Sequence, residues 1–422
     1  MFAFLCSFLL LLTPVSWLEN SFQPYGLLGY VNSPVQVAQI PSSQQPNSSQ
    51  QQVLERLFTT SEAEADWFVP SFLEQILLPQ VQMVLTDISN RLGEFQGVEE
   101  TADGFEVQFS GGTVPAQIRL TADGKIAGLF FEPPAIPIRI EEAIALLESS
   151  PYDTSLIITR DDETLAELNA DSPLAVGSTF KLAVLAALKQ QIDAGALSWD
   201  TVVTLQPEQK SLPSGIIQDW PDGSFITVDT LATLMISVSD NTATDLLMQT
   251  VGREAIEALT EVMDERNQPF LTTRETFILK NPENAWLLRR YRNADTEARR
   301  RVLEELGDRP LPSVNAFTGE PVAIDVEWFF SSRQLCSLMD SVAQLPAMQV
   351  NPGVANPRNW EHIAFKGGSE PGVLNLTTHL TNEAGHTYCV SATWNSAEQP
   401  LNEEMLTQLY QSIIAGLAQR ED

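Results

Sequence analysis

A serine and a lysine three residues apart could carry out nucleophilic chemistry. Ser178 and Lys181 belong to the stretch Ser-Thr-Phe-Lys, which opens a strongly apolar segment predicted to be a helix. Side chains at this spacing share one helical face, so the hydroxyl and the amine can meet. A serine hydroxyl needs a base, and a lysine whose pKa is lowered by burial or nearby positive charge can be that base. The alternative is a helix-capping serine followed by an ordinary helix lysine.

A second polar group, Ser239-Asp240-Asn241, follows another apolar segment predicted to be a helix. The hydroxyl of Ser239 could pass a proton to a leaving nitrogen, and the amide of Asn241 could hold a substrate carbonyl. A polar helix cap or an Asx turn would explain the same residues without any catalytic role.

A third group, Lys366-Gly367-Gly368, follows His-Ile-Ala-Phe and precedes a strand-like stretch. Two glycines would let a strand edge approach a ligand closely. The lysine would supply a fixed positive charge for a substrate carboxylate and lower the pKa of the neighbouring amine. The alternative is a turn at the entry to a strand.

The order and spacing of the three groups resemble the S-x-x-K, S-D-N and K-[ST]-G motifs of class A β-lactamases and penicillin-binding proteins. Ser239 follows Ser178 by 61 residues, close to the class A interval. The resemblance covers roughly residues 138–422. It implies a β-lactamase-like serine hydrolase that attacks β-lactam amides through an acyl-enzyme.

The resemblance also implies a role for each matching side chain. Ser178 would be the acylated nucleophile, and Lys181 its general base or proton relay. Ser239 would relay the proton to the leaving group. Asn241 would bind substrate, and Lys366 would hold the acidic group of the substrate.

Other parts of the implied site depart from the family pattern. The backbone N–H groups of Ser178 and Ser369 would form an oxyanion hole. Gly367 occupies the position where the family motif has a serine or threonine hydroxyl, and the next hydroxyl along the chain is that of Ser369, two residues later. Glu275 lies 36 residues after Ser239, where class A enzymes have the glutamate that activates water for deacylation, but the R-x-E-x-x-L-N pattern is absent. The alternative for Glu275 is a surface carboxylate paired with an arginine.

The helices and strands that must position the candidate site residues are predicted to lie between residue 138 and the C-terminus. A helix and two strands begin this region, and two strands and a long helix end it. Strands at both ends with helices between them predict an α+β fold, in which one antiparallel sheet packs against a helical lobe. An arginine-rich stretch within the lobe, 289–306, predicts one solvated amphipathic helix; a lid or a contact with the N-terminal domain is the alternative. The predicted elements of the sheet layer are 141–149, 154–160, 164–170, 372–381, 386–395 and 403–419.

A smaller α+β domain is predicted at 53–137. Helix-spaced apolar residues up to Leu92 indicate two or three helices, interrupted by prolines. Alternating strands follow, with turns at Gly111–Gly112 and Asp123–Gly124. The domain resembles the nuclear-transport-factor-2/cystatin-like modules that precede some β-lactamase-like domains. We expect this domain to have a packing role, or to cap the side where substrate binds, rather than to have a second catalytic activity.

The N-terminus predicts export. Residues 1–20 hold an apolar run typical of a signal peptide, and 21–52 are rich in Gln, Ser, Pro and Asn, typical of a disordered linker. We therefore expect a secreted or periplasmic protein without stable membrane insertion after processing. The partner we expect is a small-molecule substrate, a β-lactam or an ester.

Charge and residue composition exclude further classes of partner. The net charge of −31 and the pI near 4.3 argue against nucleic acid. The histidines form no metal-ligand pattern, so we expect no metal and no cofactor. Cys336 and Cys389 leave two states open, a disulfide or two buried thiols, and we favour the thiols.

Three functions follow from the sequence. The leading prediction is β-lactam hydrolysis by a monomer. The second is an esterase or penicillin-binding peptidase on the same scaffold with slow deacylation, acting on an ester or peptide. The third is a non-catalytic periplasmic binding or sensing module.

Overall fold

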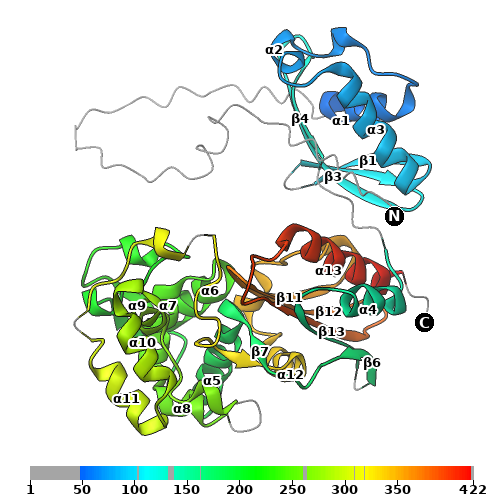
Figure 1. The fold of residues 1–422 in the computed structure, drawn as a ribbon. Coiled ribbons are helices and arrows are strands. Elements are labelled where there is room, and N and C mark those ends of the chain that lie inside the picture. The colour runs from blue at the N-terminus through cyan, green and yellow to red at the C-terminus, as the bar shows by residue number, and fades with distance from the viewer. Residues whose placement is uncertain are drawn as a thin grey trace, which may run out of the picture. The chain divides into compact units, whose positions relative to one another are not determined.

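Two compact units make up the chain, Met1–Pro137 and Ile138–Asp422 (Figure 1). The computed structural model describes residues 48–101, 104–131, 137–161, 163–259, 264–307, 309–317 and 319–419. The predicted signal peptide at 1–20 and residues 21–47 of the predicted linker lie outside the described residues. Within the described part of the chain, no helix is long and apolar enough to cross a membrane.

The N-terminal unit consists of helices followed by a four-stranded antiparallel meander in the order β1-β2-β3-β4. Its helix α1 begins at Ser48, so the expectation that residues up to 52 are linker was wrong for the last five of them. Apolar side chains of this helix, such as Leu54 and Leu57, are buried in the unit's core, which explains why the helix extends into the Gln-rich stretch. The elements are α1 (Ser48–Thr59), α2 (Pro70–Leu73), α3 (Leu78–Leu92), β1 (Phe95–Thr101), β2 (Gly104–Phe109), β3 (Gly112–Leu120) and β4 (Ile126–Phe131).

The C-terminal unit is built on a five-stranded antiparallel sheet in the order β11-β12-β13-β5-β6. The sheet joins the two ends of the unit, and β11 lies at its edge. Helices α4 and α13 cover one face, where their apolar side chains pack against alternate residues of the strands (Figure 1). This architecture confirms the predicted α+β class. The elements are α4 (Ile140–Glu148), β5 (Asp153–Arg160), β6 (Glu163–Leu168), β11 (His362–Glu370), β12 (Val373–Thr381), β13 (Thr387–Asn395) and α13 (Glu403–Ala418).

The helical lobe surrounds α5, which is buried along most of its length. Its sequence is apolar on every side because neighbouring helices cover it all round. The arginine-rich stretch forms two helices, not the single helix predicted, because Asp295 caps a new helix N-terminus and accepts a bond from Ala298 N. The helices are α5 (Lys181–Asp193), α6 (Val228–Ser237), α7 (Asn241–Val251), α8 (Arg253–Glu257), α9 (Thr273–Lys280), α10 (Ala285–Arg292), α11 (Thr296–Glu304) and α12 (Ser332–Val342). Two short strand pairs complete the unit: β7 (Leu174–Ala175) with β10 (Phe329–Phe330), and β8 (Val202–Thr204) with β9 (Phe225–Thr227).

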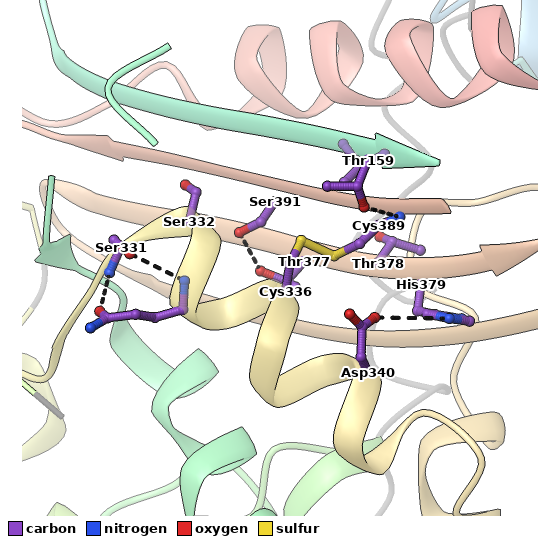
Figure 2. Close-up of a disulfide and its surroundings, with 12 residues drawn as sticks. Thr159, Ser331, Ser332, Cys336, Asp340, Thr377, Thr378, His379, Cys389 and Ser391 are labelled. Atoms are coloured by element: carbon purple, nitrogen blue, oxygen red, sulfur yellow. Dashed lines mark hydrogen bonds and ion pairs between the residues drawn. A yellow bond between two sulfur atoms is a disulfide. The ribbon is translucent and has the colours of Figure 1, made fainter. Parts of the chain in front are cut away.

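A disulfide joins the lobe to the sheet. Cys336 of α12 is bonded to Cys389 of β13, and Figure 2 shows the bond between the helix and the strands. Our preference for two free thiols was therefore wrong. Sequence could not decide it, because 53 residues separate the cysteines and only the packing of α12 on the sheet brings them together. The same face of the sheet holds His379, whose Nε2 lies 4.0 Å from Asp340 of α12.

Candidate active site

Ser178 lies in a short 3₁₀ turn, η3 (Gly177–Phe180), that leads directly into α5. The buried ring of Phe180, the last residue of the turn, stacks on Trp328 with ring centroids 3.8 Å apart, and this contact holds the turn in place. Its first residue, Gly177, has φ of +50°, a backbone conformation that favours glycine. Ser178 itself is partly exposed, while Thr179 and Phe180 beside it are buried. The fold thus presents this hydroxyl at the end of a buried helix.

Strand β11 packs directly against this turn. A Cβ atom placed on Gly368 would lie 2.5 Å from Ser178 N and 2.7 Å from Thr179 N, so only glycine fits there. A Cβ atom on Gly177 would lie 3.2 Å from Ser369 N, which places the backbone of Ser369 beside the same turn. The structure therefore brings Ser178 and Ser369 together. The Ser369 hydroxyl donates to Glu403 of α13, at 2.9 Å from each carboxylate oxygen.

Lys181 is completely buried one turn after Ser178. Its Nζ donates to Ser239 O at 2.6 Å and to Asn241 Oδ1 at 2.7 Å, and it lies 3.1 Å from Ser239 Oγ. Burial, reinforced by the positive charge of Lys366, holds the pKa of Lys181 well below its usual range. A lysine in this environment can give up its proton and act as a base at neutral pH.

Lys366 approaches the same serine from β11. Its Nζ donates to Ser239 Oγ at 3.1 Å and to the carbonyl of Gly367. Burial lowers the pKa of this amine to about 7. Ser239 Oγ therefore lies between two lysine amines, and Ser239 has φ of +56°, which is uncommon for a residue with a side chain. Three of the predicted site residues meet at this hydroxyl.

Asn241 is buried, and both ends of its amide are engaged. Oδ1 accepts from Lys181, and Nδ2 donates to Leu212 O at 3.0 Å. The amide therefore ties Lys181 to the loop before α6. The residue between the two predicted positions, Asp240, holds the same loop by accepting from Ile216 N at 2.7 Å and Ile217 N at 2.9 Å.

Glu275 occupies the first turn of α9. Oε2 accepts from Thr272 N at 2.8 Å, while Glu275 N donates to Thr272 Oγ1, which is a capping box. Oε1 accepts from Arg253 of α8 at 2.7 Å. None of these bonds reaches Ser178 or Lys181, so the structure does not join Glu275 to the group around Ser239. Its role in deacylation stays a prediction.

A buried charged cluster near the site was missed at the sequence level. Lys280, at the end of α9, donates to Glu327 and, at 2.7 Å, to Glu370 Oε1 of β11. Burial and the neighbouring Glu370 raise the pKa of Glu327 well above its usual range, and the two carboxylates raise the pKa of Lys280. The alternation of β11 could have revealed Glu370, because it shares a strand face with Lys366. Nothing in the sequence pattern singles out Lys280 or Glu327.

A second missed carboxylate lies deeper in the lobe. Asp245 of α7 accepts bonds from Thr273 N, Thr273 Oγ1 and Arg274 N at 2.8, 2.9 and 2.9 Å. Burial raises its pKa to about 7. It anchors the N-terminus of α9 to the helix that begins at Asn241.

Part of the C-terminal unit is similar to a known protein family. Residues 139–278 match the Beta-lactamase2 family model, described as the Beta-lactamase enzyme family. The match includes Ser178, Lys181, Ser239 and Asn241 and ends before β11.

Individual relatives are distant. The β-lactamase VEB-1 of Pseudomonas aeruginosa is 27% identical over 99 residues, which are 23% of this chain and 33% of that protein. The chain thus matches about a third of the length of this curated relative. Among solved structures, a β-lactamase from Sphaerobacter thermophilus has 21% identity and a TM-score of 0.44, covering 66% of this chain and 94% of that chain. A structure of PBP-A has 17% identity and a TM-score of 0.44, with coverages of 66% and 94%.

Proposed function

We propose that this chain is a serine hydrolase of the β-lactamase type, which cleaves β-lactam amides through an acyl-enzyme on Ser178. The observation that carries the proposal is the convergence of Lys181 and Lys366 on Ser239 Oγ, 3.1 Å from each amine, beside the turn that holds Ser178. The match of residues 139–278 to the β-lactamase family model supports the same activity.

Acylation would begin with proton transfer from the hydroxyl of Ser178 to Lys181. The amine can accept this proton because burial and Lys366 lower its pKa. Its two shortest bonds, to Ser239 O and Asn241 Oδ1, match the two hydrogens of a neutral amine. The serine oxygen would then attack the amide carbonyl, and the N–H groups of Ser178 and Ser369 would hold the resulting oxyanion.

Cleavage of the amide requires a proton on the leaving nitrogen. Ser239 can deliver it, because its hydroxyl lies within hydrogen-bond distance of Lys181, which would have received the proton from Ser178. Lys366 would attract the substrate carboxylate by its positive charge. Asn241 would keep Lys181 oriented, which differs from the direct substrate contact expected from the sequence, and Glu275 is the sequence's candidate for activating water.

The finer features of the proposal concern the setting of the enzyme. We infer export by a signal peptide at 1–20, a periplasmic or secreted location, and resistance to β-lactam antibiotics as the benefit to the cell. The disulfide between α12 and β13 supports an oxidising compartment. We further propose that residues 53–137 form a cystatin/NTF2-like module and that the enzyme is a monomer.

Turnover of a chromogenic cephalosporin by the purified protein tests the proposal. We expect steady-state hydrolysis by the wild type and none by Ser178→Ala. Cleavage of a simple ester without cleavage of the cephalosporin would overturn the β-lactamase assignment. Absence of any penicillin adduct on Ser178 would overturn the serine-hydrolase assignment.

A further inference from the structure

The carboxylate of Glu370 lies on the same face of β11 as Lys366. Alternate residues of a strand point to one side, so Lys366, Gly368 and Glu370 share this face. Gly368, between them, packs against Ser178 N. Two residues of strand span about 7 Å. Lys366 and Glu370 therefore lie on either side of Gly368, on the face of β11 that packs against the nucleophile's turn.

The surroundings of Glu370 hold its side chain in place. Lys280 donates to Oε1 at 2.7 Å, and the side chain of Lys280 is only 1% exposed. The side chain of Glu370 is 24% exposed, so water can reach it. The Lys280 contact fixes one carboxylate oxygen while the group stays accessible to solvent.

Glu327 gives a second sign that this cluster is built for more than an ion pair. Its side chain is fully buried, and among the described residues its Oε2 has no hydrogen-bond partner. An unsatisfied buried oxygen is costly in a folded protein, and a catalytic role is one explanation for it. Two carboxylates that compete for one lysine form the kind of pair that enzymes use to bind and release a proton.

Deacylation needs such a group. Water must lose a proton as it attacks the acyl carbon, and a carboxylate within reach can accept it. Both oxygens of Glu275 are engaged, by Thr272 N and by Arg253. Glu370 has an accessible carboxylate on the strand that packs against Ser178 N.

We propose that Glu370, supported by Lys280 and Glu327, is the general base that activates water for deacylation. The inference rests on the proposed acyl-enzyme at Ser178. The water oxygen forms a bond to the acyl carbon, and its proton moves to the Glu370 carboxylate. The bond between that carbon and Ser178 Oγ then breaks, and Oγ takes up the proton that Glu370 accepted from the water. The hydrolysed acid leaves, Glu370 is again a carboxylate, and Lys181 is a neutral amine ready for the next acylation.

The test separates acylation from deacylation in the full-length protein. Wild type, Glu370→Gln, Glu275→Gln and the exposed control Glu404→Gln are mixed with benzylpenicillin, and intact mass follows the adduct with time. We expect Glu370→Gln to acylate like the wild type and to release the adduct at least about 100-fold more slowly. Glu404→Gln should turn over like the wild type, and Glu275→Gln tests the water-activating carboxylate that the sequence predicts.

A rescue experiment tells a base from a structural support. Glu370→Ala should accumulate the adduct, and added formate should accelerate its release, because formate supplies the missing carboxylate. A structural role would not respond to formate.

Release by Glu370→Gln at the wild-type rate, trapping by Glu275→Gln instead, or a wild-type adduct that is itself long-lived would each overturn the role of Glu370. Failure of the wild type to form any adduct would overturn the proposed function itself. Adduct formation by each variant also reports that it is folded.

Discussion

Replacement of Gly368 by alanine should separate β11 from the nucleophile's turn. The added Cβ would lie 2.5 Å from Ser178 N and 2.7 Å from Thr179 N, and closer still to Val176 O, whereas ordinary contacts begin at 3.4 Å. All three are backbone atoms, so no side chain can rotate away. The strand must therefore shift by about 1 Å, and displacements of this size cost about 100-fold in rate when they misplace reacting groups.

Gly367→Ala is the matched control. Its added Cβ would meet the far end of the Phe365 ring at 2.9 Å and nothing else closer than 3.4 Å, so a small ring movement relieves it. Stopped-flow labelling with a fluorescent penicillin measures the acylation rate of both variants, and thermal unfolding measures their stability. We expect Gly368→Ala to lose about 100-fold in acylation rate and about 1–3 kcal/mol of stability. Acylation by Gly368→Ala within about threefold of the control would refute the direct packing of β11 on the turn.

Three further predictions concern the base, the sheet and the disulfide. Lys181→Arg should acylate at least about 100-fold more slowly, because arginine cannot lose its proton at any working pH; the fluorescent penicillin measures this. Burial, with a contribution from His362, lowers the pKa of His379 to about 4, whereas an unfolded histidine has a pKa near 6.5. The unfolded state then binds more protons between these values, so the free energy of unfolding should fall by about 3 kcal/mol as the pH drops from 6.5 to 4; urea titrations of the wild type and His379→Gln measure the difference. The double variant Cys336→Ala/Cys389→Ala opens a link across 53 residues and should lose about 4 kcal/mol on the chain-entropy estimate, measured by urea unfolding.

Each of these predictions has a result that contradicts it. Acylation by Lys181→Arg at the wild-type rate would show that another group removes the serine proton. A His379→Gln variant with the same pH dependence as the wild type would show that His379 does not titrate differently in the two states. A double cysteine variant as stable as the wild type would show that the bond adds nothing to the fold.

Much of the site could be predicted because its chemistry is encoded in short motifs. Ser178 and Lys181 are separated by one helical turn, so their proximity is a local property of the chain. Ser239 and Lys366 could be joined to them only through the resemblance to a known family. The predicted sheet layer was also accessible, because alternating apolar residues mark β12 and β13 and a short apolar run marks β5.

The remaining features depend on tertiary contacts between distant segments. Lys280, Glu327 and Glu370 come from α9, from the residues before β10 and from β11, and no local pattern connects them. The hydrogen bond from Arg253 of α8 to Glu275 of α9 likewise joins two segments that no local sequence pattern connects. The cap at Asp295 was readable locally, but the arginine-rich stretch around it was interpreted as one amphipathic helix with ion pairs between successive turns.

Covalent chemistry at Ser178 is the central step of the proposed function. Intact-mass measurement after a short pulse of benzylpenicillin, followed by peptide mapping, tests this most directly. We predict an adduct of the mass of the penicillin on the peptide that contains Ser178, which disappears with time in the wild type and never forms in Ser178→Ala. A wild-type protein that stays unmodified, or an adduct that persists in Ser178→Ala, would contradict the account.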